Sequence, residues 1–300
     1  MVETLDIIIP FYNEKDCIEE LFKRLYGIRK DFAVEGIETN FIFVNDGSVD
    51  GSGIIVENLA RANKFIKLIN FSRNFGHEIA VTAGLDYSNA DYTAIIDSDL
   101  QDPPELLIEM YKKLKEGDYQ VAYGKRLKRK SETTFKKVTA FLFYRLLNSL
   151  CETKLPTDTG DFRIMTANVR ESVKQLREHH RFMRGLLTWV GFKSIPVYYN
   201  RDERIAGTTK YSPLSLIKLA LTAITELSTT PLKLIWLLAG ILALLSIIMF
   251  VLGKNLYSVI LFAGFVPTFA LGLTTAYIGR IYDETRNRPL YVVEKTINLN

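Results

Sequence analysis

The sequence predicts an α/β fold, in which a mostly parallel sheet covered by helices is followed by interfacial amphipathic helices and a C-terminal two-helix transmembrane hairpin. Three observations predict it. Short β-branched runs alternate with amphipathic stretches over the first 125 residues, a basic amphipathic region follows, and two long uncharged runs lie near the C-terminus. With 300 residues, 48% hydrophobic and 24% charged, the chain is long enough for a sizeable core and does not have the composition of a disordered protein.

The first part of the chain carries the strands. Five strand-like segments are expected, with helices of about a dozen residues between them: Leu5–Pro10, Asn40–Asn45, Phe65–Phe71, Tyr92–Ile96 and Tyr119–Tyr123. This alternation of strand and helix is typical of a parallel sheet, whose ligands bind at the carboxyl ends of the strands.

Two amphipathic helices are expected between the sheet and the C-terminal runs. Apolar residues recur at helical spacing over residues 135–150, beside several basic residues. That pattern fits a helix lying in a membrane interface, and it fits a core-facing helix equally well. A second helix is expected to begin with Ser212 as N-cap and Pro213 in its first turn, and Thr230 and Pro231 repeat this start before the first long run.

The two uncharged runs cover residues 234–253 and 256–279. Each has about 20 residues or more, enough to cross roughly 30 Å of hydrocarbon, and only Lys254 and Asn255 separate them. Two buried helices of a soluble core are the alternative, but consecutive runs without ionisable groups favour a membrane hairpin. The flanking basic residues are Lys218, Lys233, Arg280, Arg286 and Arg288. This excess of Lys and Arg outside the two runs predicts that both chain ends lie on the cytoplasmic side.

Charge and cysteine content limit the classes of partner and compartment. The net charge of +4 is too small to indicate a nucleic-acid partner. Cys17 and Cys151 have neither disulfide-framework nor metal-site spacing, which favours a reducing compartment. The first ten residues lack the pattern of a secretory signal, so the front of the chain is expected in the cytosol.

The segment IIDSDLQDPPE, residues 95–105, holds the sharpest local signal. Asp97 and Asp99 end an apolar strand two positions apart, so both carboxylates are expected on the same side of the chain. Paired carboxylates there favour Mg²⁺ or Mn²⁺, and because substrate phosphates commonly complete such sites, the metal implies a diphosphate ligand. Asp102 is expected to be the N-cap of the next helix, with Glu105 completing a capping box.

A second strand ends in VNDGSVDGS, residues 44–52. Asp46 and Gly47 form a turn that needs no function, yet an acidic residue at a strand end also accepts hydrogen bonds from a base or ribose. The first strand ends at residues 10–14 on the same expected edge. Together with the strand end that carries Asp97 and Asp99, these ends would form one pocket. The chain has no G-x-G-x-x-G and no P-loop, which argues against a dinucleotide or ATP site.

Basic residues gather in two clusters. The first lies within residues 125–137 and is either a solvated face or a binding surface for anionic lipid head groups. The second, in residues 200–213, is expected to be a loop with Gly207 as a hinge, whose arginines would clamp phosphates. The three histidines, His77, His179 and His180, make no metal-ligand set and are assigned structural or surface roles.

Six segments together resemble one family: IIIPFYNE, VNDGSVDGS, FSRNFGHEIAVTAG, DSDLQDPPE, TGDFRIM and RIAGTTKYS, followed by the two uncharged runs and YIGRIYDETRNRPLY. In this order they resemble the polyisoprenyl-phosphate glycosyltransferases, inverting family 2 enzymes of GT-A fold, and within them the bactoprenol glucosyltransferases. The resemblance covers nearly the whole chain. It implies transfer of a hexose from a UDP-sugar to undecaprenyl phosphate or another polyisoprenyl phosphate at the inner (plasma) membrane. Because family members form tetramers, it also implies that the chain is a homo-oligomer.

The resemblance also implies roles for individual residues. Those expected to hold the uridine are Pro10, Tyr12, Glu14 and Asp46, and those expected to hold the metal are Asp97, Asp99 and Gln101. The carboxylate proposed as base in the family matches Asp161. Residues expected to meet the donor diphosphate or the lipid phosphate are Arg126, Arg201, Arg204 and Lys210, with Tyr211 in the same donor-binding loop. One common form of the metal motif has Ala where Ser98 stands, a change that leaves the ligands untouched.

Several alternatives stay open. A phosphate monoester has its second pKa near 6, so the acceptor is largely dianionic at neutral pH and Asp161 either takes a proton or orients the acceptor. A membrane-anchored nucleotide-sugar-binding scaffold without turnover is the alternative function. A processive polysaccharide synthase would need a QxxRW motif and further spanning helices, which the sequence lacks. Glucose is the expected sugar, while galactose, an N-acetylhexosamine and an aminopentose remain alternatives.

The expected organisation has five parts. Residues 1–130 would bind the nucleotide sugar and metal, 131–212 would form the acceptor side with the interfacial helix and basic loop, 213–230 a juxtamembrane helix, 231–279 the two transmembrane helices and 280–300 a cytoplasmic tail.

Overall fold

The computed structural model describes residues 2–127, 159–179, 181–200, 241, 245, 248, 251, 252 and 256–299. The chain divides into two compact units. The first, here called the α/β unit, comprises Met1–Thr134, Leu155–Lys210 and Pro289–Asn300, and the second, the helical unit, comprises Phe135–Lys154 and Tyr211–Arg288. The amphipathic helix expected over 135–150, the loop over 201–211, the helix expected at Ser212 and all but five residues of the run 234–253 lie outside the described residues.

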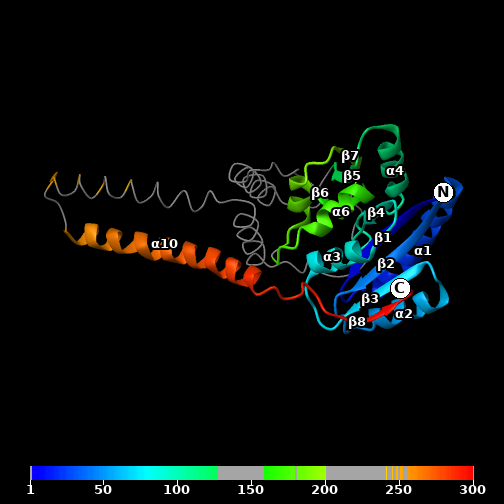
Figure 1. The fold of residues 1–300 in the computed structure, drawn as a ribbon, viewed down its shortest axis with the longest axis horizontal. Helices are drawn as coiled ribbons and strands as arrows, with labels where there is room; N and C mark the ends of the chain where they lie inside the picture. Colours follow the sequence, from blue (N-terminus) through cyan, green and yellow to red (C-terminus); the bar gives the residue numbers. More distant parts are fainter. Residues whose placement is uncertain are drawn as a thin grey trace. The chain divides into compact units, whose positions relative to one another are not determined.

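All five strands that the sequence predicts are present in the α/β unit (Figure 1). They are β1 (Glu3–Phe11), β2 (Ile37–Asn45), β3 (Ile66–Phe71), β4 (Tyr92–Ile95) and β5 (Val121–Arg126). β1 pairs in parallel with β2 and β4, and β2 pairs in parallel with β3. Because the four strands run the same way, their carboxyl ends meet at one edge of the sheet.

Three strands were not expected: β6 (Thr159–Thr166), β7 (Ser194–Tyr199) and β8 (Val293–Ile297). The sheet in the described residues has the order β7-β5-β6-β4-β1-β2-β3-β8. β6 is antiparallel to both β4 and β5, β7 is parallel to β5, and β8 is antiparallel to β3. The sheet is therefore mostly parallel, as predicted, and the beginning of β6 lies at the same edge as the carboxyl ends of β4 and β5.

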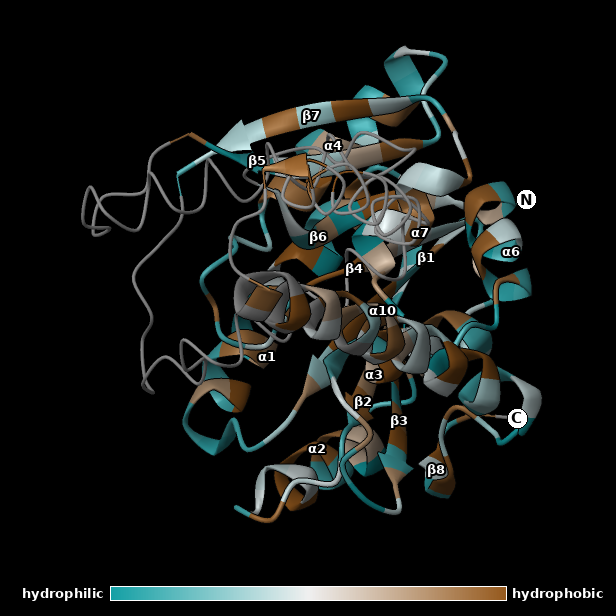
Figure 2. Ribbon diagram, turned by 90° about the vertical axis from the view of Figure 1, so that its left-hand side faces the viewer, coloured by the Kyte–Doolittle hydropathy of each residue, from teal (hydrophilic) through white to brown (hydrophobic). Residues whose placement is uncertain are grey.

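Helices cover both faces of this sheet. Helices α1 (Lys15–Val34), α2 (Ser52–Ala62) and α4 (Leu106–Glu116) pack on one face, where Ile7, Ile9 and Phe43 are fully buried. Helices α3 (His77–Tyr87), α6 (Ala167–Gln175) and α7 (Met183–Trp189) pack on the other, around Ile8 and Ile42. Neighbouring residues of β1 belong alternately to the two cores, because successive side chains of a strand point to opposite faces of the sheet. Figure 2 shows the corresponding mixture of hydrophobic and hydrophilic residues on α6.

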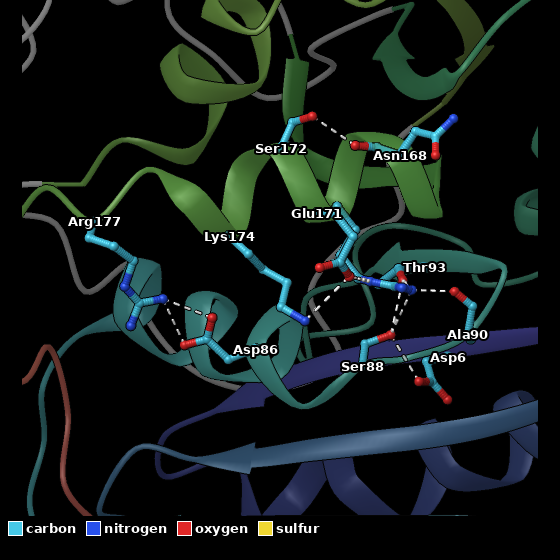
Figure 3. Close-up of polar contacts among 11 residues, drawn as sticks. Asp6, Asp86, Ser88, Ala90, Thr93, Asn168, Glu171, Ser172, Lys174 and Arg177 are labelled. Carbon is cyan, nitrogen blue, oxygen red and sulfur yellow. Dashed lines mark hydrogen bonds and ion pairs between the residues drawn. The ribbon is translucent and has the colours of Figure 1, made fainter.

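A buried polar network joins α3, α6 and the strands (Figure 3). The guanidinium of Arg170 in α6 donates to the carbonyl of Ala90 and, at 3.2 Å, to the hydroxyl of Thr93. The hydroxyl of Ser88 donates to Asp6 in β1 at 2.8 Å. Since buried polar groups are costly without partners, these contacts specify how the end of α3 and the following loop meet β1 and β4.

The segment after the helical unit returns to the α/β unit as β8. The Tyr291 ring stacks on Phe71 with centroids 5.1 Å apart, and its hydroxyl donates to Asp86 at 2.8 Å. The side-chain amide of Asn298 donates to the carbonyls of Ala60 and Ile66. β8 therefore covers the edge of β3, which would otherwise expose unpaired backbone groups.

The described part of the helical unit is dominated by α10 (Leu256–Thr285), a helix of 30 residues that contains Pro267. It includes the second uncharged run, residues 256–279. Among the described residues, no helix combines the length and apolar character needed to cross a membrane. The transmembrane hairpin thus stays a prediction.

Candidate active site

Acidic residues from two strands meet at the edge where the parallel strands end. Asp97 and Asp99 follow β4, and Asp161 is the third residue of β6. Because Ile95 pairs with Arg163 in an antiparallel ladder, the register brings residue 161 opposite residue 97. The topology therefore places the predicted metal ligand and the predicted base side by side, although 64 positions separate Asp97 from Asp161 in the sequence.

His77, the first residue of α3, lies between these two carboxylates. Its Nε2 is 3.6 Å from Asp97 Oδ1 and 3.5 Å from Asp161 Oδ2. Burial disfavours the imidazolium, but the hydrogen bond to Asp161 and the charges of both aspartates outweigh it and raise the pKa of His77 to about 10. His77 is therefore a cation at neutral pH. The sequence indicated only a structural or surface role for His77, and the structure adds its contacts with both carboxylates, because the sheet order brings the start of α3 to this edge.

Two arginines hold Asp161 from the other side. Arg184 Nε in α7 lies 3.3 Å from Asp161 Oδ1, and Arg163 in β6 lies 3.8 Å from the same oxygen. Asp161 is only 5% exposed, and burial alone would raise its pKa. Arg184, His77 and Arg163 prevail and hold the pKa well below its ordinary value, so the carboxylate stays ionised. Neither arginine was predicted from the sequence, although Arg163 stands inside the TGDFRIM segment.

Asp97 has an environment that suits a cation. Burial raises its pKa to about 6, with further contributions from Asp161, Asp102 and Asp99, although His77 opposes the shift. Its Oδ1 is a buried oxygen without a hydrogen-bond partner in the described part of the chain. An added positive charge would stabilise the ionised form of such a group.

The other predicted metal ligands lie close by. Asp99 Oδ1 accepts a hydrogen bond from the backbone N–H of Gln101 at 3.1 Å. No group of three or more His, Cys, Asp or Glu side chains forms a complete metal cage among the described residues. The carboxylates thus fit a hard cation held by one or two protein oxygens and completed by phosphates, as Mg²⁺ commonly is.

Asp102 does not cap a helix, contrary to the prediction. Helix α4 begins at Leu106 with Glu105 as N-cap and no side-chain capping bond, because the carbonyls of Pro103 and Pro104 accept the first turn's hydrogen bonds. Asp102 is instead fully buried and accepts a hydrogen bond from the Tyr199 hydroxyl at the end of β7.

Arg126, predicted to meet phosphate, lies at the end of β5 beside this pair. One of its terminal nitrogens is 3.6 Å from Asp102 Oδ1, and its Nε donates to the Tyr199 hydroxyl at 3.2 Å. Tyr199 was not predicted from the sequence, since no local pattern shows that β7 lies beside β5.

Asp46, at the end of β2, holds the loop that precedes His77. Its carboxylate accepts hydrogen bonds from the backbone N–H groups of Phe75 at 2.6 Å and Gly76 at 3.0 Å. Gly47 has φ of 70°, and a Cβ there would lie 2.6 Å from the carbonyl carbon of Arg73. The turn is therefore packed directly against this loop, and the uridine contact expected of Asp46 stays a prediction.

The remaining residues expected at the uridine lie at the end of β1. Pro10 is buried within the strand, Tyr12 follows it and is 38% exposed, and Glu14 is the N-cap residue of α1. Between them, Asn13 accepts a hydrogen bond from the Val49 N–H at 2.8 Å, which ties the β1 and β2 loops together. The first two strand ends thus share one edge, as expected.

Four predicted phosphate-binding or donor-binding residues cannot be placed at this edge: Arg201, Arg204, Lys210 and Tyr211 lie outside the described residues, as does His180.

Comparisons with known proteins agree with this geometry. The sequence profile described as Glycosyl transferase family 2 matches residues 6–173. The uncharacterized glycosyltransferase YkcC of Bacillus subtilis (strain 168) is 46% identical over 309 residues, with 98% of this chain and 94% of that protein covered. The SfII prophage-derived bactoprenol glucosyl transferase of Shigella flexneri is 36% identical over 307 residues, covering 97% of this chain and 98% of that protein.

Among solved structures, glucosyl-3-phosphoglycerate synthase from Mycobacterium tuberculosis, in complex with Mn²⁺, UDP-glucose and phosphoglyceric acid, has a similar fold. Its TM-score is 0.52 at 18% sequence identity, with 74% of this chain and 78% of that chain covered. This likeness concerns the fold, a GT-A type α/β arrangement.

Proposed function

The chain belongs to glycosyl transferase family 2 and is a glycosyltransferase, and on that basis we propose that it moves glucose from UDP-glucose to undecaprenyl phosphate or a related polyisoprenyl phosphate. The observation that carries the choice of substrates is the similarity, over 97% of the chain, to a bactoprenol glucosyl transferase. The product would be a lipid-linked monosaccharide, formed with inversion, for modification of cell-envelope glycans.

The carboxylates at the sheet edge support a nucleotide-diphosphate donor. Asp97 and Asp99, with Gln101, would hold Mg²⁺ or Mn²⁺, and the structurally similar mycobacterial synthase is described with Mn²⁺ and UDP-glucose. When bound, the ion would neutralise the charge that develops on the leaving diphosphate. Arg126 lies at the same edge and would add a fixed positive charge beside the phosphates.

The surroundings of Asp161 indicate how it would act on the acceptor. An acceptor phosphate is largely dianionic at neutral pH and needs little help from a base. Asp161 is held by Arg184, His77 and Arg163, which keep its pKa low and make it a weak proton acceptor. We therefore assign it the role of fixing these cations where two anionic substrates must approach each other.

The proposed location is the inner (plasma) membrane, with several spans and with the active site and both termini in the cytoplasm. The two uncharged runs and the basic residues that flank them support this location. A lipid bilayer and further copies of the chain, as a tetramer, would then be its partners.

The test is direct assay of lipid glycosylation. Detergent-solubilised full-length protein would be incubated with Mg²⁺, undecaprenyl phosphate and radiolabelled UDP-glucose, UDP-galactose or UDP-N-acetylglucosamine in separate arms. We expect label from UDP-glucose in the lipid fraction. Label from another donor would change the sugar assignment, and UDP binding without labelled lipid from any donor would indicate a binding scaffold.

A further inference from the structure

Three side chains from distant parts of the sequence form one buried cluster beside the carboxylates. Tyr199 ends β7, Arg126 ends β5 and Asp102 follows β4. The Tyr199 hydroxyl donates to Asp102 Oδ1 and accepts from Arg126 Nε at 3.2 Å, and a terminal nitrogen of Arg126 lies 3.6 Å from the same Asp102 oxygen. Tyr199 is 5% exposed and Asp102 is fully buried.

The donor and acceptor groups of the three side chains fix the direction of both hydrogen bonds in the cluster. A carboxylate only accepts hydrogen bonds, so the single hydroxyl proton of Tyr199 is used on Asp102. The oxygen of Tyr199 then offers only lone pairs to Arg126, whose guanidinium only donates. The plane of the Arg126 guanidinium is therefore fixed at two points, by an oxygen of Tyr199 and by the charge of Asp102.

Two glycines make room for this arrangement. A Cβ on Gly124 would lie 2.8 Å from the Tyr199 ring and 2.9 Å from that of Phe162, and a Cβ on Gly160 would lie 2.7 Å from a terminal nitrogen of Arg126. Neither glycine has a positive φ, so the requirement is for space and not for backbone freedom. Any other residue would push the ring or the guanidinium out of place.

The cluster adjoins the candidate active site through the chain itself. Gly160, against which Arg126 packs, immediately precedes Asp161, whose Oδ2 lies 3.5 Å from His77. Arg126 is thus a fixed cation next to the carboxylates that would hold the metal. A cation fixed before substrate binds needs no reordering during the reaction.

We propose that Tyr199 and Asp102 are positioning residues that hold Arg126 in the one orientation in which its guanidinium meets a substrate phosphate. The inference rests on the proposed function, because that function supplies the phosphates. The phosphate belongs either to the donor diphosphate or to the acceptor lipid, and Tyr199 and Asp102 touch neither.

The decisive variant is Tyr199→Phe, which removes one oxygen and keeps the ring in its slot. We expect kcat/KM for lipid glycosylation to fall by about 10-fold to 100-fold, the range for losing a hydrogen bond to a charged group. Asp102→Asn, which keeps the shape and removes the charge, should cause a loss in the same range. The matched control is Tyr198→Phe, since Tyr198 immediately precedes Tyr199 and is 54% exposed. It should stay within about 2-fold of the parent protein.

A double-mutant cycle separates positioning from a structural role. Once Arg126→Ala has removed the guanidinium, adding Tyr199→Phe should cause no further loss of kcat/KM. Calorimetric titration with UDP and the KM for undecaprenyl phosphate identify the phosphate: weaker UDP binding in Tyr199→Phe indicates the donor, and a higher KM for the lipid alone indicates the acceptor. Thermal melting confirms that each variant is folded.

The inference is overturned by normal kinetics and normal UDP affinity in a folded Tyr199→Phe, or by losses that add to those of Arg126→Ala. If the parent protein transfers no sugar, the proposed function fails, and the affinities of the same variants for UDP and for undecaprenyl phosphate then decide this inference alone. Weakened binding of either compound in Tyr199→Phe would still support it, and unchanged binding of both would overturn it.

Discussion

Asp161 is surrounded by charge of both signs at the edge of the sheet. Three cations, His77, Arg163 and Arg184, lie within 3.8 Å of its carboxylate oxygens. Glu78, the neighbour of His77, adds another negative group, and burial together with the charge of Asp161 raises its pKa to about 7. Replacing any one of these residues therefore shifts the pKa values of the titratable ones, His77, Glu78 and Asp161.

The metal-binding role assigned to Asp97 gives the first prediction. Asp97→Asn should lower kcat/KM by about 100-fold or more, because a cation that neutralises the leaving diphosphate would lose a ligand. Excess EDTA should abolish transfer by the parent protein, and added Mn²⁺ should restore it. Asp118→Asn is the control, since the Asp118 side chain is 87% exposed. Undiminished transfer in EDTA would exclude the metal role.

The raised pKa of Glu78 gives a prediction on pH and stability. Its folded-state pKa, about 7, lies above the ordinary value of 4.5, so the folded protein binds the extra proton more tightly. The contribution of Glu78 to stability should then be fully present below pH 4.5 and be lost as the pH rises to about 7. Glu78→Gln keeps an oxygen that accepts from the Met183 N–H and removes the ionisable group, and with it this pH dependence.

Urea unfolding of metal-free protein at pH 5 and pH 8 measures the effect. We expect the parent protein to lose about 1 kcal/mol more than Glu78→Gln between these pH values, a figure reduced from the full shift because the side chain is partly exposed. Equal pH dependence in the two proteins would show that Glu78 is ionised without cost.

The residues predicted from the sequence and those missed differ in how they are recognised. Asp97, Asp99 and Asp161 stand in short motifs, where residue type and spacing already indicate chemistry. His77 and Arg184 become part of the site only because α3 and α7 deliver them to Asp161. That depends on which strands are neighbours, and a local pattern does not contain this information.

At the scale of elements, α3 lies directly against β1. A Cβ on Gly84 in α3 would be 2.2 Å from Cγ2 of Ile8, which is fully buried. The close approach fixes the height of α3 above the sheet, and His77 at its first turn is placed accordingly.

Gly84→Ala should therefore destabilise the protein by about 1 to 3 kcal/mol, the usual cost of overpacking, and should lower transfer by displacing His77. Gly27→Ala in α1 is the control, because nothing lies within 4 Å of a Cβ there. That change should raise stability by about 0.5 to 1 kcal/mol. Thermal melting and the lipid assay measure both variants, and matching losses in the two would contradict the packing argument.

Most of the parallel sheet could be predicted from its sequence, and the strands beyond it could not. β1 to β5 are apolar runs between helices, a pattern with a clear period. β6 carries Asp161 and Arg163, both buried, and two charges within a short segment obscure the strand signal. β8 is a partly polar edge strand within the segment predicted only as a tail, and its stability comes from contacts with β3 and α2.

At the scale of the whole molecule, the α/β unit is assembled from three segments that alternate along the sequence with the two segments of the helical unit. Tyr291 helps to hold the last segment, because its ring stacks on Phe71 and its hydroxyl donates to Asp86. Tyr291→Ala should lower the free energy of unfolding by about 2 kcal/mol, less than for a fully buried aromatic residue. Val292→Ala is the control, because Val292 is 48% exposed. Equal thermal midpoints for the parent protein and Tyr291→Ala would show that the contacts of Tyr291 add no stability.

The return of the chain to β3 also has a consequence for biosynthesis. β8 follows α10 in the sequence, so a ribosome makes it after every other described element. Until then the nascent sheet has an open edge at β3, and the backbone groups there are available to a chaperone or to another unfinished chain. The β3 edge therefore stays open at least until α10 has been synthesised, and slow translation of the helical unit would prolong the interval in which the nascent protein is prone to aggregate.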